Sequence, residues 1–292
     1  ASNTSTLPIT GLAKASKRPN QFIGLHFFSP VDKMPLVEII VGEQTNDVTL
    51  AKGFDYVLQI GKTPIVVNDS RGFFTSRVFG TYVMEAAAMV GEGVHPRAIE
   101  MAGLEAGMPM PPLAIHDEVT LSLSLSIMEQ AKKDMEAAGQ TYPEHPGEAT
   151  IRAIAQKHGR VGKKEGKGYY DYENGQKTLW PGLAEEFPLA DDQPDSQEIQ
   201  DRLMMIQANE AARCLQEKVL RTVADGNIGS IFGLGFAPFT GGMLQYINAM
   251  GVRNFVNKCE ELAVKYGERF KPAGLLVELA EQGKALTDVA ER

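Results

Sequence analysis

The sequence predicts an α/β segment followed by an all-α part, and three observations support this fold class. Short apolar runs bounded by turn residues fill residues 1–68, helical spacing of apolar residues dominates after Gly72, and one helical pattern recurs further along the chain. Hydrophobic residues make up 43% and charged residues 23% of the 292 positions, which is ordinary for a globular protein. We therefore expect three domains, over residues 1–68, 69–180 and 181–292.

The first of these segments has the pattern of the closing part of an α/β domain. Four strand-like apolar runs occupy residues 7–9, 22–28, 36–41 and 64–67. Between the last two, residues 47–60 carry apolar side chains at helical spacing, with Asn46 or Thr45 available as the cap and Gly61 as the stop. A doubly wound sheet needs more strands than these. We therefore expect the beginning of this domain to lie upstream of the sequence.

The chain after Gly72 is predicted to be mainly helical. Apolar spacing predicts helices over residues 73–90, 95–105, 114–138 and 148–158. Residues 173–197 contain three prolines and an Asp-Asp pair, a composition typical of a connector.

An internal similarity links the two helical parts. Residues 84–87 (MEAA) and 92–94 (EGV) resemble residues 209–212 (NEAA) and 217–219 (EKV), and the offset is 209 − 84 = 125 residues in both cases. A looser match relates residues 107–111 to residues 235–239. The pattern favours one helical domain that was duplicated. Chance similarity between two amphipathic helices is the alternative.

Charge and cysteine content exclude several classes of function. The formal net charge is −8, whereas binding to nucleic acid needs a basic face. No stretch approaches the ~20 uninterrupted apolar residues of a membrane span. Cys214 and Cys259 are too few for a disulfide framework or a metal cluster, so we expect buried thiols. The sequence thus predicts no nucleic-acid partner, no membrane span and no metal site.

His26 differs from the four other histidines because it lies inside an apolar strand. We expect His95, His116, His145 and His158 to be surface or hydrogen-bonded residues. A buried imidazole needs partners for both ring nitrogens, and Glu38 stands in an equally apolar neighbouring run, where an unpaired carboxylate is costly. If the two strands are adjacent, Glu38 binds one ring nitrogen and leaves the other free as a base. A catalytic dyad and a buried structural pair both fit this spacing.

Four segments resemble the (S)-3-hydroxyacyl-CoA dehydrogenase family in its own order and spacing. They are residues 2–5 (SNTS), 24–30 (GLHFFSP), 35–40 (PLVEII) and 159–170 (GRVGKKEGKGYY). The second helical part, with Gly233–Phe236 and Gly241-Gly242, resembles the α subunits of the fatty-acid β-oxidation complex. This resemblance implies the closing strands of a Rossmann-type domain, followed by two duplicated helical dehydrogenase C-terminal domains, and NAD as the cofactor.

The resemblance also implies roles for individual residues. His26 would take the proton of the 3-hydroxyl group while a hydride leaves C3 for NAD, and Glu38 would orient His26. The remaining residues that it implies are Ser5 and Ser76 on the catalytic side and Asn3, Ser29 and Lys164 on the cofactor side. Ser76 and Ser29 stand where the family usually or often has asparagine, and a hydroxyl cannot donate and accept through separate atoms as an amide does. We therefore expect Ser76 to hold the substrate oxygen through a water, or less tightly than asparagine does.

The sequence lacks the Gly-x-Gly-x-x-Gly loop that binds pyrophosphate in a Rossmann domain. We expect this loop upstream, and we expect the chain by itself to bind NAD weakly. The resemblance further implies an acyl-CoA substrate, a homodimer, a thiolase subunit as a partner and a cytoplasmic location. Two alternatives remain: a helical oligomerisation or scaffold module of the β-oxidation complex, and a short-chain 3-hydroxybutyryl-CoA enzyme.

Overall fold

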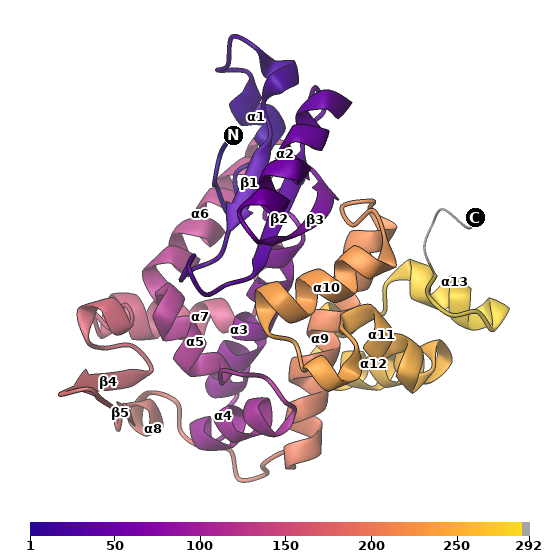
Figure 1. Ribbon diagram of the computed structural model, residues 1–292. Helices are drawn as coiled ribbons and strands as arrows, with labels where there is room; N and C mark the ends of the chain where they lie inside the picture. The colour runs from indigo at the N-terminus through magenta and orange to yellow at the C-terminus, as the bar shows by residue number, and fades with distance from the viewer. Residues whose placement is uncertain (288–292) are drawn as a thin grey trace. The chain divides into compact units, whose positions relative to one another are not determined.

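The computed structural model describes residues 1–287 and divides into two compact units (Figure 1). Unit 1 comprises Ala1–Gly80 together with the chain from Met205 onward, and unit 2 comprises Thr81–Met204. Unit 1 therefore joins the first and last parts of the sequence. None of the helices within residues 1–287 is both long and apolar enough to cross a membrane.

A three-stranded sheet forms the centre of the first part of unit 1. Its strands are β1 (Gly24–Phe27), β2 (Leu36–Val41) and β3 (Thr63–Asn68), in the order β1-β2-β3. β1 pairs antiparallel with β2, whereas β2 and β3 are parallel and are connected by helix α2 (Asp47–Gln59). The Asn46 side chain accepts a hydrogen bond from the Thr49 amide at 2.9 Å, so the cap predicted for α2 is confirmed.

The strand predicted at residues 7–9 is wrong, because a short helix, α1 (Ile9–Ala13), starts there. The amides of Ile9 and Thr10 donate to the carboxylate of Asp69 at 2.8 and 2.7 Å. Asp69 lies sixty residues further along the chain, so this helix start is stabilised by a contact that local sequence cannot reveal. A 3-10 turn, η1 (Pro19–Gln21), follows before β1.

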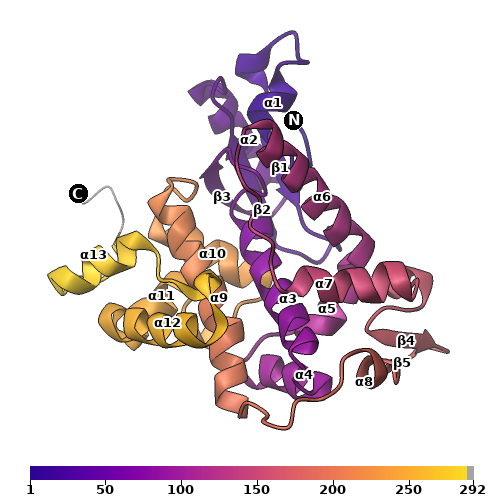
Figure 2. The ribbon, with the colours of Figure 1, turned by 180° about the vertical axis from the view of Figure 1, so that it is seen from behind.

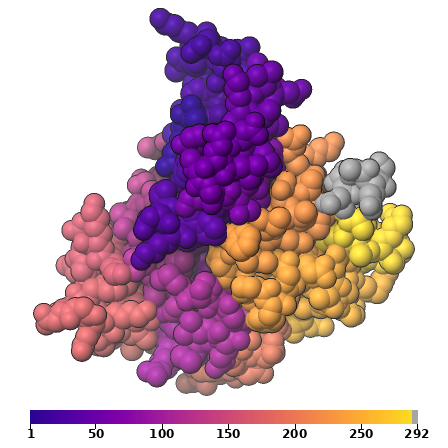
Figure 3. All heavy atoms as spheres, viewed as in Figure 1, coloured from indigo at the N-terminus to yellow at the C-terminus, as the bar shows by residue number. Residues whose placement is uncertain are grey.

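The two faces of the sheet are covered by helices from different parts of the sequence. On one face, Ile23, Leu25, Val37 and Ile39 pack with Val57 of α2. Side chains alternate between the faces of a strand, so the residues between these point to the opposite face. Helix α10 (Val223–Leu234) contacts β2 and β3 there. In Figure 3 the orange atoms of this region adjoin the purple atoms of the first 80 residues.

The rest of unit 1 is helical. It begins at Met205, within α9 (Ser196–Gln216). Its remaining elements are η4 (Pro238–Thr240), α11 (Met243–Met250), α12 (Val252–Tyr266), η5 (Glu268–Phe270) and α13 (Gly274–Gln282). Cys214 of α9 and Cys259 of α12 are both buried, as the sequence predicts. Burial raises the pKa of the Cys259 thiol to about 12.

Unit 2 begins within α3 (Thr75–Gly91) and ends within α9 (Figure 2). Its helices are α4 (Pro96–Glu105), α5 (Pro112–Val119), α6 (Leu121–Ala137), α7 (Gly147–Arg152), the π-helix η2 (Ala153–Lys157), the 3-10 turn η3 (Lys163–Glu165) and α8 (Leu183–Glu186). The strands β4 (Tyr170–Glu173) and β5 (Gln176–Leu179) form a separate hairpin.

Two predictions in unit 2 need correction. The single helix predicted over residues 114–138 is divided into α5 and α6 at Thr120, whose φ of 73° ends one helix while its hydroxyl caps the next. Apolar spacing continues across the break, which hides it in the sequence. The connector predicted over residues 173–197 contains β5 and α8. Asn174-Gly175, both with positive φ, form the turn between β4 and β5, and this dipeptide is a hairpin signal that we overlooked.

The other four histidines do not all match the expectation. His95, His145 and His158 are exposed or half-buried and hydrogen-bonded. His116 is instead fully buried, with Nε2 2.9 Å from the Ser124 hydroxyl, while its Nδ1 has no hydrogen-bond partner among residues 1–287. Burial lowers the pKa of His116 to about 3. This imidazole is therefore a neutral core group.

Two arginine clusters join α3 to α9, one in each unit. Each arginine binds two glutamates, with donor–acceptor distances between 2.5 and 2.9 Å. The clusters are Arg77 with Glu210 and Glu217 in unit 1, and Arg202 with Glu85 and Glu92 in unit 2. Each arginine thus stands on one of the two helices and its glutamates stand on, or just beyond, the other.

Glu100 is expected to make the stability of unit 2 depend on pH. Burial raises its pKa from 4.5 to about 7, although the Tyr170 hydroxyl and the Leu113 amide donate to its carboxyl group. The pKa of Glu100 is higher in the folded state than in the unfolded state. The contribution of Glu100 to the free energy of unfolding is therefore full below pH 4.5 and is lost as the pH rises through 7. Between pH 4.5 and 7 we expect the free energy of unfolding to fall by roughly 3 kcal/mol less in Glu100→Gln than in the wild type. Urea unfolding at several pH values measures the difference.

Asp117 also makes stability depend on pH, so the wild type and the variant must be compared with each other. Burial raises its pKa to about 6, and it titrates in the wild type and in the Glu100→Gln variant alike. The difference between the two stability curves therefore isolates Glu100. Parallel curves between pH 4.5 and 7 would contradict the prediction.

Candidate active site

The pairing of β1 with β2 places His26 directly opposite Glu38. The His26 Nδ1 atom lies 2.9 Å from Glu38 Oε2, and the two residues are 7% and 0% exposed. A carboxylate can only accept, so Nδ1 carries the hydrogen and donates it. The contact predicted between the two anomalous strand residues is confirmed. It leaves Nε2 as the ring nitrogen that can receive a proton.

Glu38 is held by more than the imidazole. Its Oε1 atom accepts hydrogen bonds from the amides of Phe74 and Thr75 at 2.9 and 3.1 Å. Its Oε2 atom also accepts from the Thr75 hydroxyl at 2.6 Å. These donors stand at the start of α3, where the helix dipole favours a negative charge. The carboxylate therefore has donors at both oxygens and is fixed in orientation.

Thr75 is a site residue that the sequence reasoning missed. Its side chain is 1% exposed, and its hydroxyl lies 3.5 Å from His26 Nδ1 in addition to its bond with Glu38. A threonine before Ser76 has no distinguishing local pattern. Only its position at the first turn of α3, facing the carboxylate, indicates its role.

Replacing Thr75 by valine is expected to destabilise the protein by about 1.5–3 kcal/mol, because a hydrogen bond to a buried charged group is lost at nearly constant side-chain volume. Urea unfolding of the wild type and the variant measures the change. Thr75→Ser keeps a hydroxyl and serves as the control, with a smaller expected loss. Unchanged stability in Thr75→Val, with a loss only in Thr75→Ser, would show that the methyl group, not the hydrogen bond, matters.

Aromatic rings surround the imidazole. The Phe28 ring centroid lies 4.6 Å from that of His26, and the Phe73 centroid lies 6.1 Å away. Apolar neighbours reduce the local dielectric constant and strengthen the hydrogen bond between His26 and Glu38. The arrangement can therefore accept a proton at Nε2 and stabilise the resulting imidazolium with the adjacent carboxylate.

The other predicted residues of unit 1 lie on neighbouring segments. The Asn3 side chain accepts from the Phe27 amide at 2.8 Å, since Ser2 bridges to Gly24 and the chain start runs beside β1. Ser5 is exposed after this bridge, Ser29 is exposed beyond the end of β1, and Ser76 is half-buried on α3 beside Thr75.

Lys164 lies in unit 2, where it is exposed within η3. Of the seven predicted site residues, His26 and Glu38 are in direct contact, and Asn3 is bonded to the strand that carries His26.

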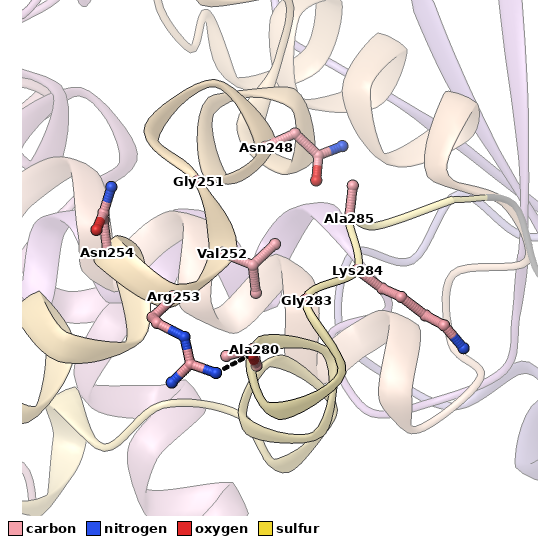
Figure 4. Close-up of a pocket in the computed structure, with 9 residues that line it drawn as sticks. All are labelled: Asn248, Gly251, Val252, Arg253, Asn254, Ala280, Gly283, Lys284 and Ala285. Carbon is pink, nitrogen blue, oxygen red and sulfur yellow. Dashed lines mark hydrogen bonds between the residues drawn. The ribbon is translucent and has the colours of Figure 1, made fainter.

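A separate cavity of about 290 Å³ opens among α11, α12 and α13 (Figure 4). It is lined by Asn248, Gly251, Val252, Arg253, Asn254, Ala280, Gly283, Lys284 and Ala285. Arg253 donates to the Ala280 carbonyl at its edge. The lining includes none of the predicted site residues.

Two family profiles match the chain. The profile described as "3-hydroxyacyl-CoA dehydrogenase, NAD binding domain" matches residues 1–70, and "3-hydroxyacyl-CoA dehydrogenase, C-terminal domain" matches residues 72–172. Together these matches cover more than half of the sequence.

One known protein is similar to the chain over nearly its whole length. The fatty acid oxidation complex subunit alpha of Idiomarina loihiensis is 41% identical over 287 residues, which are 97% of this chain and 39% of that protein. The chain thus spans about two fifths of the length of this curated relative.

Two solved structures of related enzymes are similar to the chain. The (S)-3-hydroxybutyryl-CoA dehydrogenase PaaH1 of Ralstonia eutropha is 35% identical with a TM-score of 0.53, and the match covers 59% of each chain. The 3-hydroxybutyryl-CoA dehydrogenase of Escherichia coli K12 has a TM-score of 0.76 at 23% identity, covering 96% of this chain and 75% of that one. The second match shows the fold: a Rossmann-like α/β part with a helical C-terminal part.

Proposed function

The chain belongs to the 3-hydroxyacyl-CoA dehydrogenase family, and we propose that it carries the catalytic base for the NAD-dependent oxidation of (S)-3-hydroxyacyl-CoA to 3-ketoacyl-CoA. The observation that carries the proposal is the buried contact between His26 and Glu38 at 2.9 Å. Glu38 uses both oxygens on fixed donors, so it holds His26 Nδ1 protonated and His26 Nε2 available.

In the proposed mechanism, His26 Nε2 accepts the proton of the 3-hydroxyl group as the carbonyl bond forms at C3. Bound NAD supplies the acceptor for the hydride that leaves C3. Glu38 stabilises the positive charge that develops on the imidazole. Ser5 and Ser76 would donate hydrogen bonds to the reacting oxygen, and Ser76 would do so less tightly than the asparagine usual in the family.

The cofactor side would be formed by Asn3, Ser29 and Lys164. The Asn3 side chain already fixes the chain start beside β1 through the Phe27 amide, and the exposed Ser29 hydroxyl follows the end of the same strand. Hydroxyl and amide groups suit the carboxamide and ribose of a nicotinamide cofactor. The exposed Lys164 ammonium would suit a phosphate of the cofactor.

We also propose that the helical parts, over residues 69–180 and 181–292, arose by duplication. The two arginine clusters support this, because each member has a counterpart at one offset: 202 − 77, 210 − 85 and 217 − 92 all equal 125. Reciprocal contacts of this kind are the signature of a two-fold relation. Helix breaks recur in the same order, although at a different offset of 251 − 120 = 131 residues: Thr120 before α6 and Gly251 before α12 have positive φ values of 73° and 84°.

The relative's name supports a place in a fatty-acid oxidation complex. We propose an acyl-CoA substrate, a cytoplasmic location, and assembly as a homodimer or with a thiolase subunit. Light scattering of the purified protein, alone and with a thiolase subunit, tests the assembly. Chain-length preference is tested by turnover across a series of acyl-CoA thioesters.

The test of the reaction is NADH formation from (S)-3-hydroxyacyl-CoA by the longest natural polypeptide that contains these 292 residues. NADH formation that depends on His26 supports the proposal. Wild-type rates in a His26 variant would overturn it and favour a scaffold role for the helices.

A further inference from the structure

Helix α10 lies on the sheet face that carries His26 and Glu38, although it comes from residues 223–234. The segment before it is attached to the end of β3. The Asn68 amide donates to the Val219 carbonyl at 2.9 Å, and the Asn68 side chain donates to the Lys218 carbonyl at 2.7 Å. These bonds fix where α10 begins relative to the sheet, within unit 1 (Figure 1).

Two glycines on one face of α10 permit its close approach to the sheet. A Cβ atom at Gly229 would lie 2.6 Å from Ile65 Cδ1 and 3.0 Å from Phe74 Cε1. A Cβ atom at Gly233 would lie 2.6 Å from Leu36 Cδ2 and 3.5 Å from Phe28 Cζ. The two positions are four residues apart, so they share a helix face. A Cβ atom at either position would require the end of the Ile65 or Leu36 side chain to shift, and at Gly229 it would also press on the Phe74 ring, whereas Phe28 lies at ordinary contact distance from Gly233.

The two phenylalanines at this contact both adjoin the reactive pair. The Phe28 ring lies against the His26 imidazole, with centroids 4.6 Å apart. The Phe74 amide donates to Glu38 Oε1 at 2.9 Å. A continuous set of contacts therefore runs from Gly233 through Phe28 to His26, and from Gly229 through Phe74 to Glu38.

We propose that α10 is a positioning element of the reactive site: its glycine face sets the places of Phe28 and Phe74, and through them the geometry of the His26–Glu38 hydrogen bond. The effect on turnover rests on the proposed function, whereas the effect on the hydrogen bond does not. Interiors are close-packed, so a displacement of a few tenths of an ångström at Gly229 or Gly233 passes to the neighbouring rings.

The test uses Gly229→Ala and Gly233→Ala in the full chain, with NMR of the ¹⁵N-labelled histidine rings. In the wild type we expect the His26 nitrogens to report hydrogen on Nδ1, as the bond to Glu38 requires. In both variants we expect the Nδ1 and Nε2 signals to move toward each other as the second tautomer becomes populated. Turnover is expected to fall about tenfold or more, because misplacing a catalytic group by a fraction of an ångström is costly.

Gly226→Ala is the matched control on the same helix. Its Cβ atom would meet Leu244 Cδ1 at 2.8 Å and Leu220 Cδ1 at 3.0 Å, so it disturbs packing without touching Phe28 or Phe74. We expect it to lower the melting temperature while leaving the His26 signals in place. Equal changes of the His26 signals in all three variants, or unchanged signals in Gly229→Ala and Gly233→Ala, would overturn the proposal.

Two further measurements separate a folding defect from loss of positioning, and the positioning role from the proposed function. If Gly233→Ala does not fold, Leu36→Val is added, because it removes the Cδ2 atom that lies 2.6 Å from the new Cβ; the His26 signals of this double variant are then expected to match the wild type. Altered signals in the folded double variant would count against the proposal. If the signals respond as expected but the longest natural polypeptide that contains these 292 residues forms no NADH, the positioning role stands and the proposed function fails.

Discussion

Replacing His26 by glutamine is expected to lower kcat for 3-hydroxyacyl-CoA oxidation by about 10²–10⁴-fold, the usual contribution of a positioned general base. A glutamine amide at this site can still hydrogen-bond to Glu38, but it cannot accept a proton from the substrate hydroxyl. The rate is measured by NADH absorbance at saturating substrate, in the longest natural polypeptide that contains the chain.

Binding separates a catalytic role from a structural one. We expect the dissociation constant for acyl-CoA, measured by calorimetry, to change little in His26→Gln, because the residue is only 7% exposed and its proposed role lies in the transition state. A loss of binding as large as the loss of rate would identify His26 as a structural residue. Unfolding by urea checks that the variant is folded.

Replacing Glu38 by glutamine is expected to lower kcat by about 10³–10⁴-fold, with a smaller effect on stability. The carbonyl oxygen of the new amide can accept from the backbone amides of Phe74 and Thr75, which now bond to Glu38 Oε1. Its NH₂ group then faces His26 Nδ1 and can only donate. The imidazole must therefore carry its hydrogen on Nε2, the nitrogen required as the base.

Glu38→Ala distinguishes tautomer control from simple packing. Alanine leaves two backbone amides, the Thr75 hydroxyl and the His26 ring without their buried acceptor, so we expect a loss of about 3–5 kcal/mol in the free energy of unfolding. Glu38→Gln should lose much less in the same urea experiment. If glutamine and alanine have equal effects on both stability and rate, tautomer control is not the function of Glu38. The NMR signals of His26 report the tautomer directly.

The sequence by itself determined the features that depend on local pattern. Apolar runs bounded by turn residues located β1, β2 and β3, and helical spacing with Asn46 as cap located α2. Two polar residues, His26 and Glu38, each placed in an apolar strand, predicted their own contact, because a buried polar group needs a partner.

Tertiary structure decided what depends on contacts between distant residues. The Asp69 carboxylate stabilises the start of the helix over residues 9–13 by accepting hydrogen bonds from the Ile9 and Thr10 amides. The positive φ of Thr120 separates two helices within a continuous apolar pattern. Neither effect changes the spacing of side chains along the sequence, so neither could be predicted from it.

The site shows the same division. The contact between His26 and Glu38 was predictable because each residue violates the pattern of its own strand. Thr75 was not, because a threonine at a helix start is common and its role depends on facing Glu38 across the fold. Glycine inside a helix ordinarily weakens it, and only the distances from the α10 glycines to Ile65 and Leu36 show that they permit close packing. The role of a residue can be predicted from sequence when its chemistry differs from that of its neighbours along the chain, as a polar residue in an apolar strand does. A residue that matches its local pattern depends for its role on contacts that only folding creates.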